Sequence, residues 1–178
     1  MLTPPVRDLH RCYPGRFVTD VRTSCSDLWL GNPWLTPMPD DEPGVRVIDC
    51  HYPIIHKSNQ APWHFLFGFT EFLSDELGLR VQPTEHHGDI HLTREEREWF
   101  ARVEEARGEA RPYWLFASGG KWDYTIKWWS AERYQQVVDH FRGRIDFVQV
   151  GESHHHHPDV RGVVDLCGTT NLRPRVRV

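Results

Sequence analysis

A group of side chains suited to holding an anion lies in the segment SGGKWDYTIKWWSAERY, residues 118–134. Its Gly-Gly pair lets the backbone approach a ligand closely, and its two lysines supply ammonium groups. Ser130 is a good helix N-cap, and the N–H groups at a helix N-terminus attract phosphates. The segment favours a phosphate-binding loop, and a solvated loop whose tryptophans fold back on the domain is the alternative. The candidate residues are Ser118, Gly119, Gly120, Lys121 and Lys127.

The elements around this loop predict a parallel sheet. Residues 113–117 read as a buried strand before the loop, and residues 131–141 follow as a helix with one apolar face that stops at Gly143. Strands are then expected at 145–150 and 163–166. This succession predicts parallel strands with helices on their faces, and such sheets bind ligands at the carboxyl ends of the strands. The sequence therefore predicts an α/β fold with the loop at a ligand crevice.

The earlier part of the chain predicts a second set of elements. β-Rich runs at 17–23 and 45–52 predict strands, the second of them suited to burial in a parallel sheet. Helices are expected at 4–10, 24–30, 65–77 and 93–106. The last one begins at a capping box formed by Thr93 and Glu96. The two domains, both incomplete, are expected to span residues 1–109 and 110–178.

A second polar stretch, HYPIIHKSNQAPWHF, lies between an expected strand and an expected helix. Side chains with many hydrogen-bond donors and acceptors read hydroxyl-rich sugars, so this stretch predicts binding of a saccharide acceptor. Helix capping and surface solvation are the alternative. The candidate acceptor-binding residues are His56, Lys57, Ser58, Asn59 and Gln60.

Composition excludes several classes of protein. The formal net charge is −4 and no basic tail stands out, which argues against a nucleic-acid binder. No apolar run is as long as a membrane span, and the N-terminus lacks a signal-peptide profile, so a cytoplasmic protein is expected. Neither a Walker lysine signature nor a G-x-G-x-x-G pattern is present. The cysteines lack metal or redox spacing and read as reduced thiols. They are Cys12, Cys25, Cys50 and Cys167.

Three stretches, KWWSAERYQQVVDHF, IDFVQVGE and VVDLCGTTNLR, resemble the C-terminal domain of glycosyltransferase family 9. This is the ADP-heptose:lipopolysaccharide heptosyltransferase family. Upstream, LTPPVRDLHRCYPG and SCSDLWLGNPWL are similar to the family's early helices and Asn-Pro turn. The resemblance implies a GT-B architecture, in which one Rossmann-like domain takes the acceptor and the other the nucleotide-sugar donor. It also implies an inverting transfer that needs no metal and no cofactor beyond the donor.

The resemblance also implies roles for individual residues. Lys127 would contact the donor diphosphate, with the 118–120 turn against it, and Glu152 would lie near the nucleoside. The remaining donor-side residues implied are Gly151, Gly168, Thr169 and Thr170. The expected partners are a nucleotide sugar such as ADP-heptose and a saccharide or lipopolysaccharide-core acceptor, with peripheral membrane contact through that acceptor.

Departures from the family pattern bear on activity. The resemblance implies a base, an aspartate in a Gly-Asp loop that would fall upstream of Met1, so no catalytic residue is assigned here. RPRVRV, residues 173–178, reads as foreign sequence after a frame change. These features predict a truncated transferase with little or no activity as a fragment. A remnant that binds nucleotide or glycan without turnover is the alternative. Asp89 and Asp123 are bases by type, but nothing in the sequence places either near a substrate.

Two histidine-rich stretches invite a metal-site interpretation. His154 to His157 are adjacent residues that point in different directions, so a solvated loop is favoured over a metal site. The other stretch does not repeat at helical spacing and is interrupted by Gly88, so we interpret it as a linker, with metal binding as the alternative. Its residues are His86, His87, Asp89 and His91. The sequence thus predicts no metal ligand.

Overall fold

The computed structural model describes residues 2–51, 60, 62, 64–98, 102–108, 112–123, 125–169 and 173. The chain divides into two compact units, Met1–Leu92 and Thr93–Val178. Within the described residues, no helix has the length and apolar character needed to cross a membrane. Each unit has its own buried apolar residues.

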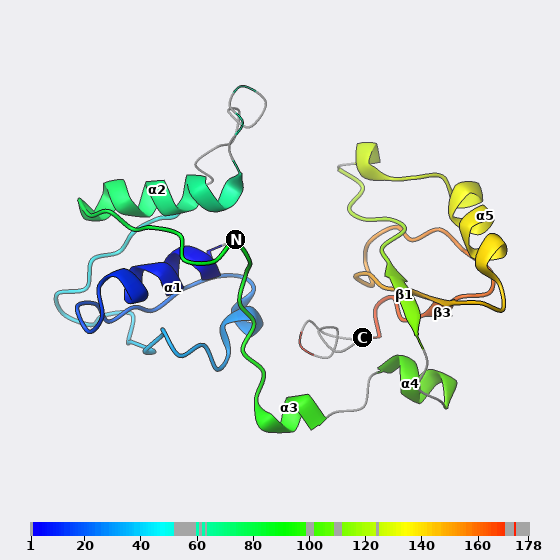
Figure 1. Ribbon diagram of the computed structural model, residues 1–178, viewed down its shortest axis with the longest axis horizontal. Coiled ribbons are helices and arrows are strands. Elements are labelled where there is room, and N and C mark those ends of the chain that lie inside the picture. The colour runs from blue at the N-terminus through cyan, green and yellow to red at the C-terminus, as the bar shows by residue number, and fades with distance from the viewer. Residues whose placement is uncertain are drawn as a thin grey trace. The chain divides into compact units, whose positions relative to one another are not determined.

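The first unit is built on two helices that pack side by side, α1 (Thr3–Cys12) and α2 (Phe65–Leu77) (Figure 1). Proline occupies the start of α1, where its missing N–H costs no hydrogen bond. α2 begins at His64, whose Nδ1 accepts a hydrogen bond from the Leu66 N–H, and ends at the left-handed Gly78. Both predicted helices are confirmed. The buried apolar residues described in this unit include Pro4, Pro5, Val6, Leu9, Leu66, Phe69 and Val81.

The prediction of strands at 17–23 and 45–52 is wrong: the residues described in these ranges form no strand. The only helical element between them is a short 3-10 turn, η1 (Ser26–Trp29), at the predicted 24–30 helix. Val47 is 87% exposed, so the β-rich run buries no face. The Asp20 carboxylate accepts hydrogen bonds from the Val21 and Met38 N–H groups, which take the place of ladder bonds. A parallel sheet is therefore not formed by the described residues of the first unit.

The second unit contains a three-stranded parallel sheet in the order β1-β2-β3. Its elements are α3 (Arg94–Glu98), α4 (Arg102–Arg107), β1 (Tyr113–Phe116), η2 (Thr125–Lys127), α5 (Ala131–Phe141), β2 (Asp146–Gln149) and β3 (Val164–Asp165). Trp114 pairs with Phe147, and Val148 pairs with Val164. The predicted strand, helix, strand unit and the α/β class are confirmed.

Two apolar clusters hold this sheet. Val138 of α5 packs with Phe147 and Val160 in one cluster. Val148 packs with Val103 of α4 in the other. α5 is capped by Ser130, whose hydroxyl accepts a hydrogen bond from the Arg133 N–H, as the sequence predicted. These clusters fix where the strands end and so where the loops of the candidate site begin.

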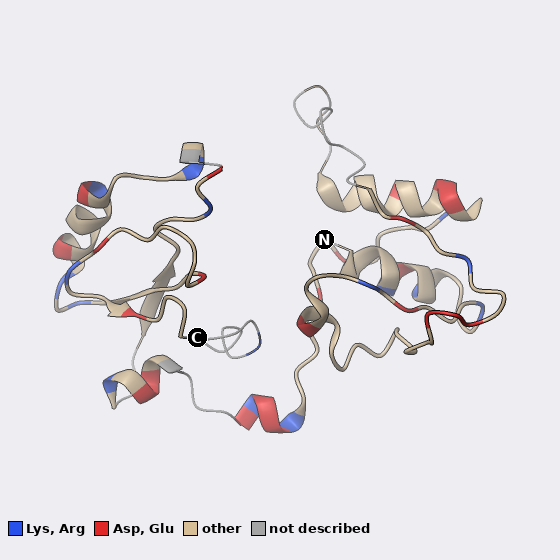
Figure 2. Ribbon diagram, turned by 180° about the vertical axis from the view of Figure 1, so that it is seen from behind, with Lys and Arg blue, Asp and Glu red and all other residues tan. Residues whose placement is uncertain are grey.

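The charged helix segments before β1 belong to the second unit, so the division falls earlier than the expected boundary at 109/110. Acidic and basic residues are mixed along α3 and α4 (Figure 2). Arg107 reaches the Asp146 carboxylate at 2.5 Å, which ties α4 to the start of β2. Thr93 and Glu96 form the predicted capping box, in which each side chain accepts from the other's backbone N–H.

Candidate functional site

The three strands deliver three of the predicted donor-side segments to one edge of the sheet. Residues 118–120 follow β1, residues 151–152 follow β2 and residues 168–169 follow β3. The Gly168 N–H donates to the Gly151 carbonyl at 2.9 Å, which joins two of these turns directly. Parallel strands place their carboxyl ends together, which is why the sequence could predict this grouping. Thr170 lies outside the described residues.

The glycines of these turns pack against the chain's own loop of residues 152–157, which we call the histidine loop. A Cβ added at Gly119 would lie 1.7 Å from the His156 carbonyl oxygen. At Gly151 it would lie 1.9 Å from the His157 imidazole, and at Gly168 2.7 Å from the Ser153 Cβ. The close approach that the sequence predicted for a ligand is thus made by this loop.

Tryptophan rings hold the histidine loop in place. The His156 ring stacks on Trp128 with centroids 4.6 Å apart, and Trp122 lies 4.7 Å from the same ring. Gly120 and His156 exchange two backbone hydrogen bonds, of 3.0 and 3.1 Å. Trp128 therefore folds back on the domain, which is the alternative that the residue types left open. Of the predicted solvated loop His154 to His157, His154 is exposed, whereas His155, His156 and His157 are half-buried.

Buried polar atoms lie beneath and beside this loop. Ser118 is 1% exposed, and its hydroxyl has no hydrogen-bond partner among the described residues. The His157 Nε2 bonds to the Glu152 carbonyl at 2.8 Å, while its buried Nδ1 has no such partner. The buried Gln149 Oε1 is likewise without one. Polar groups of this kind can form hydrogen bonds to a ligand only when the histidine loop no longer covers them.

The two lysines of the opening segment are exposed, Lys121 after the glycine turn and Lys127 at the end of η2. The first turn of α5 already carries an anion, since Glu132 accepts hydrogen bonds from its own backbone N–H and from Ser130. These two bonds lower the pKa of the Glu132 carboxyl below its ordinary value. An incoming phosphate at this helix end would meet Glu132 first.

Replacing Gly119 with alanine is expected to displace the histidine loop, because the new Cβ would overlap backbone atoms of His156. Overpacking of this kind costs about 1–3 kcal/mol. The measurement is urea unfolding followed by tryptophan emission. Gly120→Ala is the matched control, since its Cβ would meet only the Trp128 Nε1 at 3.4 Å. Equal stability of the two variants would contradict this packing.

The predicted acceptor side chains are not placed by the structure. His56, Lys57, Ser58 and Asn59 lie outside the described residues, and Gln60 is an exposed turn residue. An open hollow of about 530 Å³ lies along α2, and no motif in the sequence predicted it. Part of its lining is Pro62, Phe67, Thr70, Ser74 and Arg80.

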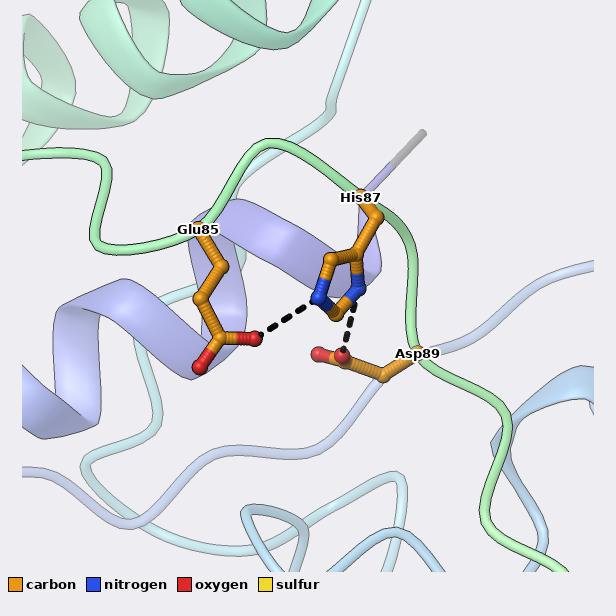
Figure 3. Close-up of side chains that lie close together, drawn as sticks. All are labelled: Glu85, His87 and Asp89. Atoms are coloured by element: carbon orange, nitrogen blue, oxygen red, sulfur yellow. Dashed lines mark ion pairs between the residues drawn. The ribbon is translucent and has the colours of Figure 1, made fainter.

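The structure brings together one further group of side chains in the first unit, two of which, His87 and Asp89, belong to the stretch for which the sequence left metal binding as the alternative; Glu85 was missed. Glu85, His87 and Asp89 gather beside α1, and one ligand atom of each lies within 4.8 Å of the others (Figure 3). The chain bends at His86 and His87, so the grouping depends on the local path of the backbone, which residue spacing does not specify.

A buried arginine organises that region. The Arg7 guanidinium donates to Asp8 Oδ1 at 3.0 Å and to Asp89 Oδ1 at 2.8 Å. It also donates to the backbone carbonyls of Glu85 and His87, at 2.9 and 3.1 Å. Arg7 therefore holds the segment of residues 85–89 against α1.

In comparisons with known proteins, the chain matched no family model, no curated protein and no solved structure. The resemblance to glycosyltransferase family 9 thus depends on the quoted motifs and on their order along the chain.

Proposed function

We propose that the carboxyl edge of the second unit's sheet binds the diphosphate of a nucleotide sugar such as ADP-heptose. One observation carries this proposal: glycine turns follow all three parallel strands, and the loop after the first leads into the capped N-terminus of α5. Crevices of this construction take phosphorylated ligands in α/β proteins.

The proposed reaction is transfer of a heptose-like sugar to a saccharide acceptor by an inverting displacement that needs no metal. Lys127 and the first N–H groups of α5 would stabilise the charge that develops on the leaving diphosphate. Glu152 would contact the nucleoside, and the first unit would hold the acceptor in a GT-B arrangement. No described residue is assigned as the base.

Donor binding at this edge requires the histidine loop to move, because atoms of that loop already pack against Gly119, Gly151 and Gly168. The Glu132 carboxylate must also give up its hydrogen bond to the N-terminus of α5, or share the N–H groups there with the diphosphate. Trp122 and Trp128 contact His156, so displacement of the loop would change their surroundings. Tryptophan emission is therefore a direct readout of binding.

Lys127→Ala is expected to weaken binding of ADP about tenfold, since a charge-assisted hydrogen bond to phosphate contributes roughly 1.5–3 kcal/mol. The measurement is a titration of tryptophan emission with ADP, repeated with AMP, which lacks the second phosphate. Arg142→Ala removes a cation from the opposite end of α5 and serves as the control. Unchanged ADP affinity in Lys127→Ala would reject the assignment of this lysine.

A non-catalytic binding protein is the second candidate, favoured because no described residue is assigned as the base. The two candidates separate in a transfer assay with ADP-heptose and a lipopolysaccharide-core oligosaccharide. Turnover supports the transferase. ADP-heptose binding without sugar transfer or release of ADP supports the binding protein. If the chain binds no ADP or ADP-heptose at all, both are rejected.

A further inference from the structure

The geometry points to a zinc site in the first unit, formed by Glu85, His87 and Asp89. One imidazole and two carboxylates are ligands that zinc accepts. Their ligand atoms already lie within 4.8 Å of one another, and the three side chains converge on one space (Figure 3). This inference is independent of nucleotide-sugar binding, which concerns the other unit.

The imidazole is oriented for coordination. The His87 Nδ1 lies 3.2 Å from the Gly88 carbonyl oxygen, and a carbonyl oxygen can only accept, so Nδ1 carries the proton. In the neutral ring, Nε2 then has a lone pair, which faces the Glu85 Oε2 at 3.0 Å. Two lone pairs at this distance repel unless a proton or a metal ion lies between them. A bound zinc ion satisfies both atoms.

An arginine orients each of the two carboxylates, and the Asp89 Oδ1 that Arg7 holds also lies 3.9 Å from the His87 Nδ1. Arg11 donates to the Glu85 Oε1 at 2.5 Å, which leaves Oε2 toward His87. Arg7 donates to the Asp89 Oδ1 at 2.8 Å, while the buried Asp89 Oδ2 has no hydrogen-bond partner among the described residues. Outer contacts of this kind fix the orientation of metal ligands.

The charge of the surroundings permits a cation. Three carboxylates, of Asp8, Glu85 and Asp89, face two guanidinium groups, of Arg7 and Arg11, so the formal sum is 2 − 3 = −1. Arg7 also lies 3.6 Å from the Glu85 Oε2 and competes for that atom. The His87 side chain is 69% exposed, which leaves the ion a path from solvent and room for water as a further ligand.

The test is zinc binding to the full chain after chelator treatment, measured by competition with a chromophoric zinc indicator. We expect one zinc ion per chain and at least a roughly tenfold loss of affinity in His87→Ala. His86→Ala is the matched control, because His86 contacts Phe67 and contributes no ligand atom. Both positions are exposed, so circular dichroism should show an unchanged fold.

The histidine loop could also bind zinc, so the second measurement identifies the residue. Carbethoxylation followed by peptide mass spectrometry should show that zinc protects His87 and leaves His86 reactive. Protection confined to residues 154–157, or equal zinc affinity in wild type and His87→Ala, would overturn the proposal.

Discussion

Arg7→Met is expected to unfold the first unit, because the variant leaves the Asp8 carboxylate buried without its guanidinium. Arg7 is 1% exposed and Asp8 is fully buried. Removing one partner of a buried ion pair costs about 3–5 kcal/mol, which is comparable to the total stability of a small domain. Hydrogen exchange of α1 amides, followed by mass spectrometry, reports this unit separately from the other.

Arg11→Met is the matched control for Arg7→Met. Arg11 comes from the same helix and pairs with Glu85, but its side chain is 37% exposed. A half-exposed ion pair contributes about 0–1 kcal/mol, so this variant should keep α1 protected. If Arg7→Met retains wild-type protection in α1, the buried network does not hold the unit together.

Acid is expected to destabilise the second unit through Glu96. Hydrogen bonds from Arg173, and then from the Thr93 N–H, lower the pKa of Glu96 from 4.5 to about 2. The unfolded chain therefore takes up this proton first as the pH falls. The stabilisation is complete above pH 4.5 and is lost as the pH drops from 4.5 toward 2. Urea unfolding of the second unit across this range measures the loss.

Glu96→Gln should remove this part of the pH dependence, so that wild type and variant converge in stability near pH 2. Glu98→Gln is the control, since Glu98 lies in the same helix and its side chain is 66% exposed in a surface pair with Arg94. A wild-type pH profile in Glu96→Gln would show that the pair with Arg173 contributes nothing. The pair also makes Arg173 a buried part of the unit, although the sequence suggested foreign residues there.

Local signals account for the parts of the fold that the sequence predicted. The Ser130 cap, the Thr93–Glu96 capping box and the left-handed Gly78 each act within one turn of a helix, so neighbouring residues determine them. The strand, helix, strand unit after residue 112 is also encoded locally. Strands at 17–23 and 45–52 would need partners elsewhere in the chain, and β-propensity carries no information on whether a partner exists.

The candidate site was predictable only in outline. Its glycine turns could be placed at one edge of the sheet from the order of the elements. The histidine loop fills the space beside Gly119 and Gly151. This arrangement results from tertiary packing, which cannot be predicted from the spacing of residues in the sequence. Glu85 was not linked to His87 and Asp89, because residue spacing does not show the bend at His86 and His87, and Arg7, which orders the segment, is distant in sequence.

In each unit, a buried arginine joins the first segment to the last. Arg7 bonds to Asp89, 82 positions away, and Arg173 bonds to Glu96, 77 positions away. In the first unit this contact holds positions 7 and 89 together, and in the second it holds positions 96 and 173 together. Domains with neighbouring ends tolerate circular permutation and insertion into a host loop. A short linker between either pair of positions is therefore the natural place to start a permuted or inserted version of that unit.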